Sequence, residues 1–255
     1  MIEYLSTTRL KGTCAMSNVI ALTSGKGGAG KTTFAVNIAA ALAAGGARTV
    51  LLDLNVGTRN ADIYLGLENK VLFDLADVLS GVCTLEKATV RDERFARLSL
   101  LSPPQYKLVS GMSAEHIRLI VKKLRESFDY VIIDCPGGLD RSFADAASAA
   151  EAAVIIATAD YSSVRSSEIV ERRLAGLGVE KRFLAVNMYY SRLAADNTLP
   201  DIGQIKSALS SPLIGTIAYD TDIHVANNTG CPVICEESSI SAKTFLNMAR
   251  QLAEK

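Results

Sequence analysis

Residues 24–33 constrain this chain more than any other stretch, because their sequence, SGKGGAGKTT, fits the phosphate-loop pattern G-x-x-x-x-G-K-[ST]. The apolar run at residues 19–22 predicts a buried strand before the loop, and the alanine-rich residues 34–44 predict a helix after it. A chance glycine-rich turn does not explain this order, so the stretch predicts a nucleotide phosphate site. The four fixed positions of the pattern are held by Gly25, Gly30, Lys31 and Thr32.

The residue types in this loop match what a polyphosphate needs. Glycines let the backbone wrap closely around the ligand, so that successive N–H groups can point at anionic oxygens. A helix that starts near Lys31 adds its unsatisfied N–H groups and the positive end of its dipole. Lys31 supplies a cation for the β- and γ-phosphates, and the Thr32 hydroxyl can bind Mg²⁺. The loop residues expected to bind the nucleotide are Gly25, Lys26, Gly27, Gly28, Ala29, Gly30, Lys31, Thr32 and Thr33.

Two apolar runs, residues 49–53 and 130–134, predict buried strands that each end in an aspartate. In an open α/β sheet the carboxyl ends of the strands face the ligand, so Asp53 and Asp134 would lie near the phosphate loop. An aspartate after a strand can merely cap a turn, but two beside one phosphate loop favour a metal site. We expect Thr32, Asp53 and Asp134 to hold Mg²⁺.

Strands and helices alternate along the rest of the chain. Apolar runs predict strands at residues 99–103, 154–158 and 183–187, and Ser113 can cap a helix that runs to about Glu126. This alternation predicts an α/β fold with a doubly wound, mostly parallel sheet and helices on both faces. With 255 residues, the chain suits a single domain over residues 18–255, preceded by a flexible extension over residues 1–17.

Composition excludes several classes of protein. The 27 Lys and Arg residues balance 27 Asp and Glu, so no global basic field predicts sequence-specific binding of nucleic acid. No apolar run approaches the roughly 20 residues that span a bilayer, and residues 1–17 lack the core of a signal peptide. These features favour a cytoplasmic protein. The start of the natural chain stays open between Met1 and Met16.

The five cysteines are scattered without C-x-x-C spacing. Cys231 and Cys235 could pair with each other or bind a metal, but small buried side chains are the simpler interpretation.

Lys26 makes the loop more specific, because an ordinary phosphate loop has no need of a second lysine after its first glycine. The form K-G-G-x-G-K-T-T resembles the deviant phosphate loop of the MinD/ParA family of ATPases. Residues 53–62 resemble the switch of the MinD branch more closely than that of plasmid-partitioning ParA proteins. Residues 161–168 and 214–220 also resemble family segments, so the likeness extends from about residue 18 to the C-terminus.

The resemblance implies an Mg²⁺-dependent ATPase that forms a homodimer with ATP and acts as a spatial positioning switch, in the selection of the cell-division site. Lys26 would reach across the dimer to the nucleotide of the partner subunit; a solvated loop lysine is the alternative. Asn187 matches the adenine-reading asparagine of the family, since an amide both donates and accepts, although a turn asparagine is also possible. The residues expected at the reaction are Lys26, Lys31, Asp53, Asn55 and Asp134.

This chain departs from the family pattern at three places. Asn55 stands where the switch carries a second acid that positions the attacking water, and an amide cannot accept the proton of that water. Hydrolysis is therefore expected to be slow, or to depend on a protein partner that stimulates it or carries the output. Ala218 stands where the family usually has proline. The third departure is at the C-terminus.

MinD proteins end in an amphipathic membrane helix, whereas residues 242–255 are typical of a core helix. We therefore expect that the chain alone does not bind lipid in either nucleotide state, and that membrane recruitment goes through a partner or a missing tail. The predicted inward face of this helix comprises Phe245, Leu246, Met248, Ala249 and Leu252.

Three other functions stay open from the sequence. The first is a pilus- or flagellum-positioning ATPase of the same group, and the second is a metallochaperone ATPase that carries metal on Cys231 and Cys235. The third is a module that binds ATP with little turnover, which Asn55 would favour.

Overall fold

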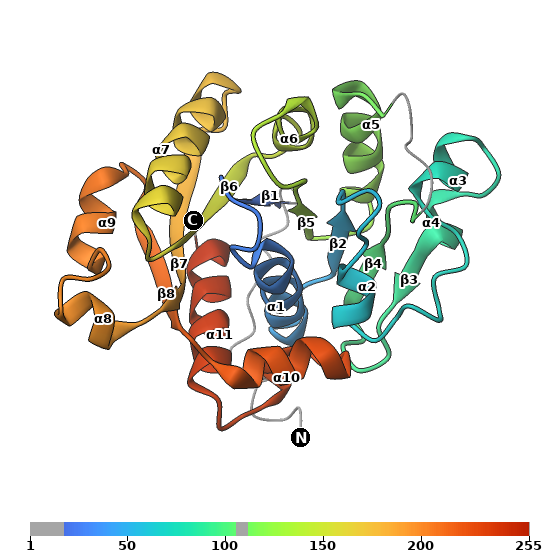
Figure 1. Ribbon diagram of the computed structural model, residues 1–255. Helices are drawn as coiled ribbons and strands as arrows, with labels where there is room; N and C mark the ends of the chain where they lie inside the picture. The colour runs from blue at the N-terminus through green and yellow to red at the C-terminus, as the bar shows by residue number, and fades with distance from the viewer. Residues whose placement is uncertain (1–17, 106–111, 255) are drawn as a thin grey trace.

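The computed structural model describes residues 18–105 and 112–254, so the predicted extension over residues 1–17 lies outside the described residues (Figure 1). The described strands form one eight-stranded sheet in the order β3-β4-β2-β5-β1-β6-β7-β8. Every pairing is parallel except that of β3 with β4. The predicted fold class is confirmed. The strands are β1 (Asn18–Thr23), β2 (Thr49–Asp53), β3 (Thr89–Arg91), β4 (Leu98–Leu101), β5 (Tyr130–Asp134), β6 (Ala152–Thr158), β7 (Lys181–Tyr189) and β8 (Leu213–Ala218).

Helices cover both faces of the sheet. In Figure 1, α5, α6 and α7 lie above the sheet, and α1 and α11 lie below it. The described helices are α1 (Lys31–Ala44), α2 (Ala61–Tyr64), α3 (Leu75–Leu79), α4 (Leu85–Ala88), α5 (Ala114–Leu124), α6 (Arg141–Ala147), α7 (Tyr161–Gly176), α8 (Ser191–Ala195), α9 (Ile202–Ala208), α10 (Thr221–Thr229), α11 (Ile240–Ala253) and the 3₁₀ helix η2 (Val233–Cys235).

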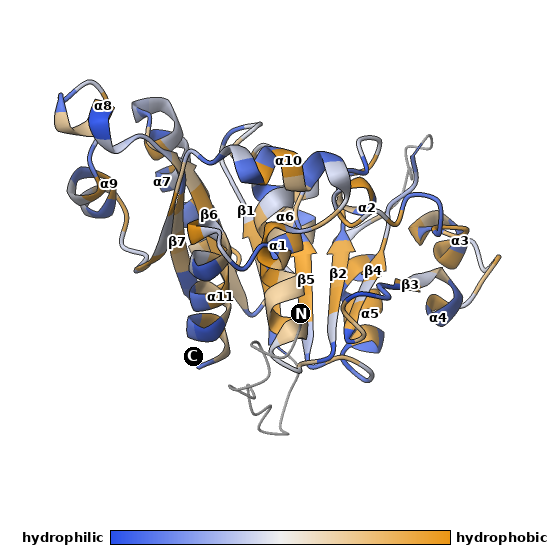
Figure 2. Cartoon of the chain, turned by 90° about the horizontal axis from the view of Figure 1, so that it is seen from below, coloured by the Kyte–Doolittle hydropathy of each residue, from blue (hydrophilic) through white to orange (hydrophobic). Residues whose placement is uncertain are grey.

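The core consists of two layers, one on each face of the sheet. Successive strand residues point to opposite faces, so Ile20 and Leu22 of β1 join the layer under α1 and α11, while Val19 and Ala21 join the layer under α5, α6 and α7. The central strands are buried on both faces and are apolar along most of their length, as Figure 2 shows for β1, β2 and β5.

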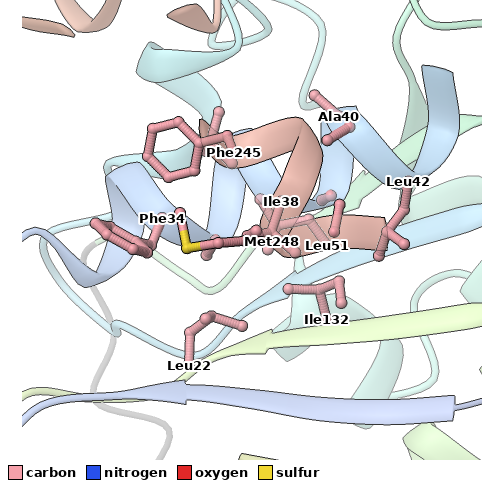
Figure 3. Packing of buried hydrophobic residues seen from close by; sticks show 14 of the residues in the cluster. Leu22, Phe34, Ile38, Ala40, Leu42, Leu51, Ile132, Phe245 and Met248 are labelled. Atoms are coloured by element: carbon pink, nitrogen blue, oxygen red, sulfur yellow. The ribbon is translucent and has the colours of Figure 1, made fainter. Parts of the chain in front are cut away.

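Helix α11 packs on α1 through an apolar contact (Figure 3). The rings of Phe34 and Phe245 meet edge to face, with centroids 4.9 Å apart. Phe245, Met248, Ala249 and Leu252 are buried, and Leu246 is partly buried. The predicted inward face of this helix is therefore confirmed.

Two other expectations changed in the structure. Ser113 does cap α5, but the helix ends at Leu124, two residues before the expected end. The expectation that Cys231 and Cys235 are small buried residues was wrong, because Cys231 is half-buried and Cys235 is exposed at the end of η2. No helix within the described ranges is long and apolar enough to cross a bilayer.

Candidate functional site

The order of the strands brings three strand ends together. Strand β1 lies in the middle of the sheet, next to β5, and β5 pairs in turn with β2. The register places Leu22 beside Asp134 and Asp134 beside Asp53. Because these strands are parallel, their carboxyl ends meet at one edge, where the phosphate loop follows β1.

Two glycines of the loop are required by close neighbours. A Cβ on Gly25 would lie 2.5 Å from the Cβ of Ser166 and 2.6 Å from its carbonyl oxygen, so α7 presses directly on the loop. Gly30 has a φ of 92° and would place a Cβ 2.3 Å from the Asn187 amide nitrogen. Only glycine fits at these two positions.

The N-terminus of α1 is free to bind an anion. Gly30 occupies the N-cap position in a left-handed conformation, and no side chain caps the helix. The first turn also carries no acidic residue, so its N–H groups and the helix dipole favour a phosphate. Lys31, the first residue of the helix, lines the same cavity.

Four of the predicted residues meet in one buried network beyond the loop. The Thr32 hydroxyl donates to Asp134 Oδ2 at 2.6 Å. The Asn55 side-chain amide donates to Asp53 Oδ1 at 2.9 Å and to Asp134 Oδ2 at 2.7 Å. Both aspartates are fully buried. Asn55 therefore acts as a bridge between the two carboxylates, which a second acid at this position could not do.

The network fits a divalent cation. Asp53 Oδ2 and Asp134 Oδ1 are buried and have no hydrogen-bond partner in the described part of the chain. Burial raises the pKa of Asp53 to about 6, and burial together with the negative charge of Asp53 raises the pKa of Asp134 to about 8. Mg²⁺ prefers carboxylate and hydroxyl oxygen ligands and would neutralise both charges, so Thr32, Asp53 and Asp134 suit it.

Lys26 lies apart from this network, on the outer side of the loop. Its ammonium group donates to Asp160 Oδ1 at 3.3 Å and to Ser162 Oγ at 3.1 Å, both at the start of α7. Half of its side chain is exposed. The single chain thus holds Lys26 at the surface, next to its own phosphate loop.

Asn187 also lies apart from the carboxylates, behind the loop. Its amide nitrogen donates to the Ala29 carbonyl at 2.9 Å, and the residue is only 4% exposed. In this structure Asn187 therefore supports the loop, and its role toward adenine stays a prediction.

A cavity of about 720 Å³ is lined by the loop and by Asn55, and its volume is within the range of small-molecule sites. Most of its lining residues were not predicted as site residues, among them Tyr64, Met188, His224 and Asn227. Asn227 donates to Thr33 Oγ1 at 3.0 Å, so Thr33 contacts α10. Met188 has a φ of 52°, at a place where the pairing of β7 with β8 shifts register. No local motif marks these residues, because the fold alone carries α2, β7 and α10 to one cavity.

The fold and this site define a phosphate-loop nucleotide-binding protein, in which two buried carboxylates lie beside the loop. A family model described as an AAA domain matches residues 17–172. The MinD septum site-determining protein of Synechocystis is 38% identical over 238 residues, which cover 93% of this chain and 90% of that protein. The corresponding protein of Bacillus subtilis is 37% identical over 243 residues, covering 93% and 89%.

Solved structures agree with these relatives. The MinC:MinD cell division protein complex of Aquifex aeolicus superposes with a TM-score of 0.86 at 32% identity, covering 94% of this chain and 97% of that one. MinD of Pyrococcus horikoshii, complexed with Mg-ADP, superposes with a TM-score of 0.84 at 25% identity, covering 93% and 96%. The chain belongs to the MinD/ParA family of ATPases.

Proposed function

We propose that this chain is a MinD-like ATPase that hydrolyses ATP to ADP and phosphate with Mg²⁺ and acts in placing the cell-division site. The observation that carries the proposal is the pair of fully buried carboxylates, Asp53 and Asp134, beside an uncapped helix N-terminus and Lys31. Burial disfavours charge on these two carboxyl groups, and a divalent cation bound together with a polyphosphate would supply the compensating positive charge at their unpartnered oxygens.

In this proposal the phosphates lie in the loop formed by Gly25 to Thr33, with the N–H groups of α1 and the Lys31 ammonium against their oxygens. Thr32, Asp53 and Asp134 would hold Mg²⁺, which would supply positive charge against the β- and γ-phosphates. Pyrococcus horikoshii MinD was solved with Mg-ADP, which supports this choice of nucleotide and metal.

Water would attack the γ-phosphate in line with the leaving oxygen. Asn55 would orient that water, although its amide nitrogen already donates to both carboxylates. An amide oxygen accepts a hydrogen bond without taking up a proton, so basal hydrolysis is expected to be slow. A partner protein that reorients this segment would then accelerate it.

ATP would join two copies of the chain, with Lys26 of each copy reaching the nucleotide of the other. To do so, Lys26 must leave Asp160 and Ser162, which are exposed contacts of low energy. The loss of the γ-phosphate would release the dimer, which makes the protein a nucleotide-timed switch. The Aquifex aeolicus MinC:MinD complex supports a partner of the MinC kind for the output.

The curated relatives favour division-site placement over a pilus or flagellum positioning role. The metallochaperone alternative depended on Cys231 and Cys235, and no group of three or more His, Cys, Asp or Glu among the described residues could hold a metal beside them. An ATP-binding module with little turnover remains the second candidate because of Asn55.

Isothermal titration with Mg·ATP, together with phosphate release over time, tests the proposal. Lys31→Ala should abolish binding, because it removes the cation that lines the phosphate site. Lys26→Ala is the matched control: it removes a lysine from the same loop and should still bind. Equal affinity in wild type and Lys31→Ala would rule out this loop as the site, and binding without phosphate release would favour the non-hydrolysing module.

A further inference from the structure

Arg94, in the turn between β3 and β4, joins two helix ends that are distant in sequence. Its guanidinium donates to the carbonyl of Leu65, at the C-terminal end of α2. It also donates to the carbonyl of Gly230, at the C-terminal end of α10, at 2.6 Å. Carbonyl groups at helix ends lack helical partners and carry partial negative charge, so one cation stabilises both ends.

A buried carboxylate fixes Arg94 in this position. Asp92 is fully buried and accepts from Arg94 Nη2 at 2.7 Å and from Nε at 3.2 Å. Asp92 also accepts from the backbone N–H of Arg94 at 2.8 Å. The planar guanidinium presents its donors in a rigid fork, so holding one edge on Asp92 aims the other donors at the two carbonyls.

The backbones of the same two helix ends also touch. Gly66 and Gly230 follow α2 and α10 with φ values of 59° and 65°. A Cβ on Gly230 would lie 2.7 Å from Gly66 Cα, so the contact leaves no room for a side chain. Figures 1 and 2 both show α2 and α10 side by side.

These helices reach the nucleotide cavity from different sides. Tyr64 of α2 lines it close to Asp134, and α2 directly follows the segment that contains Asn55. On the other side, His224 and Asn227 of α10 line it next to Met188 and Thr33. With the phosphates in the loop and the γ-phosphate beside Asn55, α2 would border the γ-phosphate and α10, which follows β8, would border the base.

We propose that Arg94 is a positioning residue of the nucleotide site: by tying the end of α2 to the end of α10, it makes the γ-phosphate side and the base side respond as one unit. The inference rests on the proposed ATP site. It implies that a base held against α10 improves the fit of the γ-phosphate against the α2 side, and the reverse, because binding coupling is reciprocal.

A cycle of four ligands measures this coupling. Affinities with Mg²⁺ are determined for a non-hydrolysable ATP analogue, ADP, tripolyphosphate and pyrophosphate, at concentrations where light scattering shows a monomer. The gain, which is the factor by which the terminal phosphate raises the affinity, is obtained twice. One value compares the ATP analogue with ADP, and the other compares tripolyphosphate with pyrophosphate, which lack adenosine. In wild type the gain should be about fivefold or more larger with adenosine, at the lower end of typical coupling between sites. In Arg94→Gln the two gains should become equal.

Arg91→Gln is the matched control, because Arg91 lies in the same hairpin and its guanidinium donates to the carbonyl of Ala96 in that hairpin. It should keep the wild-type coupling. Arg94→Lys keeps the positive charge but lacks the forked donors of the guanidinium. Compared with Arg94→Gln, it should restore more of the melting temperature than of the coupling between the two sides. A purely structural role would lower the melting temperature of Arg94→Gln and leave the coupling intact.

The outcomes are distinct. If wild type binds none of the four ligands, the proposed function fails and the inference fails with it. If wild type binds nucleotides but the two gains are already equal, or if Arg94→Gln keeps the wild-type coupling, the inference is overturned while the proposed function stands.

Discussion

At the scale of the residue, Asn55 changes the chemistry of the candidate site, because it stands where the family switch carries a second acid. The position follows β2, so it lies close to Asp53 in any chain with this fold. Here the amide donates to Asp53 and Asp134 together. It therefore stabilises two buried carboxylates in the absence of metal, and gives up the basic group that would help to activate water.

Asn55→Asp should raise the rate of ATP hydrolysis several-fold with Mg²⁺, because a carboxylate aligns the attacking water and can accept its proton. A tenfold change corresponds to about 1.4 kcal/mol in the activation barrier. Phosphate release at saturating Mg·ATP is the measurement. Without Mg²⁺ the same variant should melt at a lower temperature than wild type, since it replaces the donor between Asp53 and Asp134 by another carboxylate, where burial already disfavours charge. A variant no faster than wild type would mean that water positioning comes from elsewhere.

Asp160 is a second residue whose charge has a measurable effect. Burial alone would raise its pKa, but hydrogen bonds from Ser162, Thr158 and the Ser163 backbone outweigh burial and lower the pKa to about 2. A depressed carboxyl pKa adds stability above the unfolded pKa of about 4, and that stability disappears as the pH falls toward 2.

Asp160→Asn should keep the N-cap of α7 but lose the charge, at a cost of about 1 kcal/mol at pH 7. The difference from wild type should shrink as the pH falls from 5 toward 2. Urea unfolding at several pH values measures it. Lys26→Ala is the control: if the hydrogen bonds of the cap cause the effect, this variant keeps the pH dependence. If the stability difference between wild type and Asp160→Asn did not change with pH, the charge of Asp160 would not be its cause.

At the scale of the element, α11 is defined by its packing. It buries an aromatic and several aliphatic side chains against α1 and β8, and its outer side is polar (Figures 2 and 3). Gly215 of β8 allows this close approach, because a Cβ there would lie 2.7 Å from Met248 Cγ. The apolar face of α11 is thus used inside the domain.

Phe245→Ala should lower the free energy of unfolding by about 3–5 kcal/mol, because the ring is fully buried and meets Phe34 edge to face. Chemical denaturation gives the value. Asn247→Ala, an exposed position on the same helix, should change stability by less than about 0.5 kcal/mol. A loss below about 1 kcal/mol in Phe245→Ala would mean that α11 contributes little to the core.

At the scale of the whole molecule, the phosphate loop lies at the carboxyl ends of the central strands, and the Lys26 side chain beside it is half-exposed. One chain supplies the phosphate loop, the two buried carboxylates and the cavity. The proposed function adds a second copy, whose role is to close this face when ATP is bound.

Wild type should therefore form a dimer with Mg·ATP and stay monomeric with ADP, while Lys26→Ala stays monomeric with both but still binds nucleotide. Size-exclusion chromatography with light scattering decides this. The reason is charge: the half-exposed ammonium can exchange a weak surface ion pair for a triphosphate. A dimer that forms regardless of the nucleotide would contradict the switch.

By itself, the sequence determined the alternating strands and helices, the class of fold and the residue types of the phosphate loop. These features depend on local periodicity and on short motifs, in which interacting residues lie within a few positions of each other. The two strand-terminal aspartates were predicted for the same reason, because parallel strands end at one edge of a sheet whatever their order.

Only the tertiary structure decided which side chains meet. Asn55 reaches Asp134 over 79 positions, Asn187 reaches Ala29 over 158, and Arg94 reaches Gly230 over 136. Gly25 is required because Ser166 of α7 packs directly against it, and the phosphate-loop pattern does not predict this contact. Such contacts follow from the order of the strands and the packing of helices across them. Many distant residues determine that order jointly, and no local pattern encodes it.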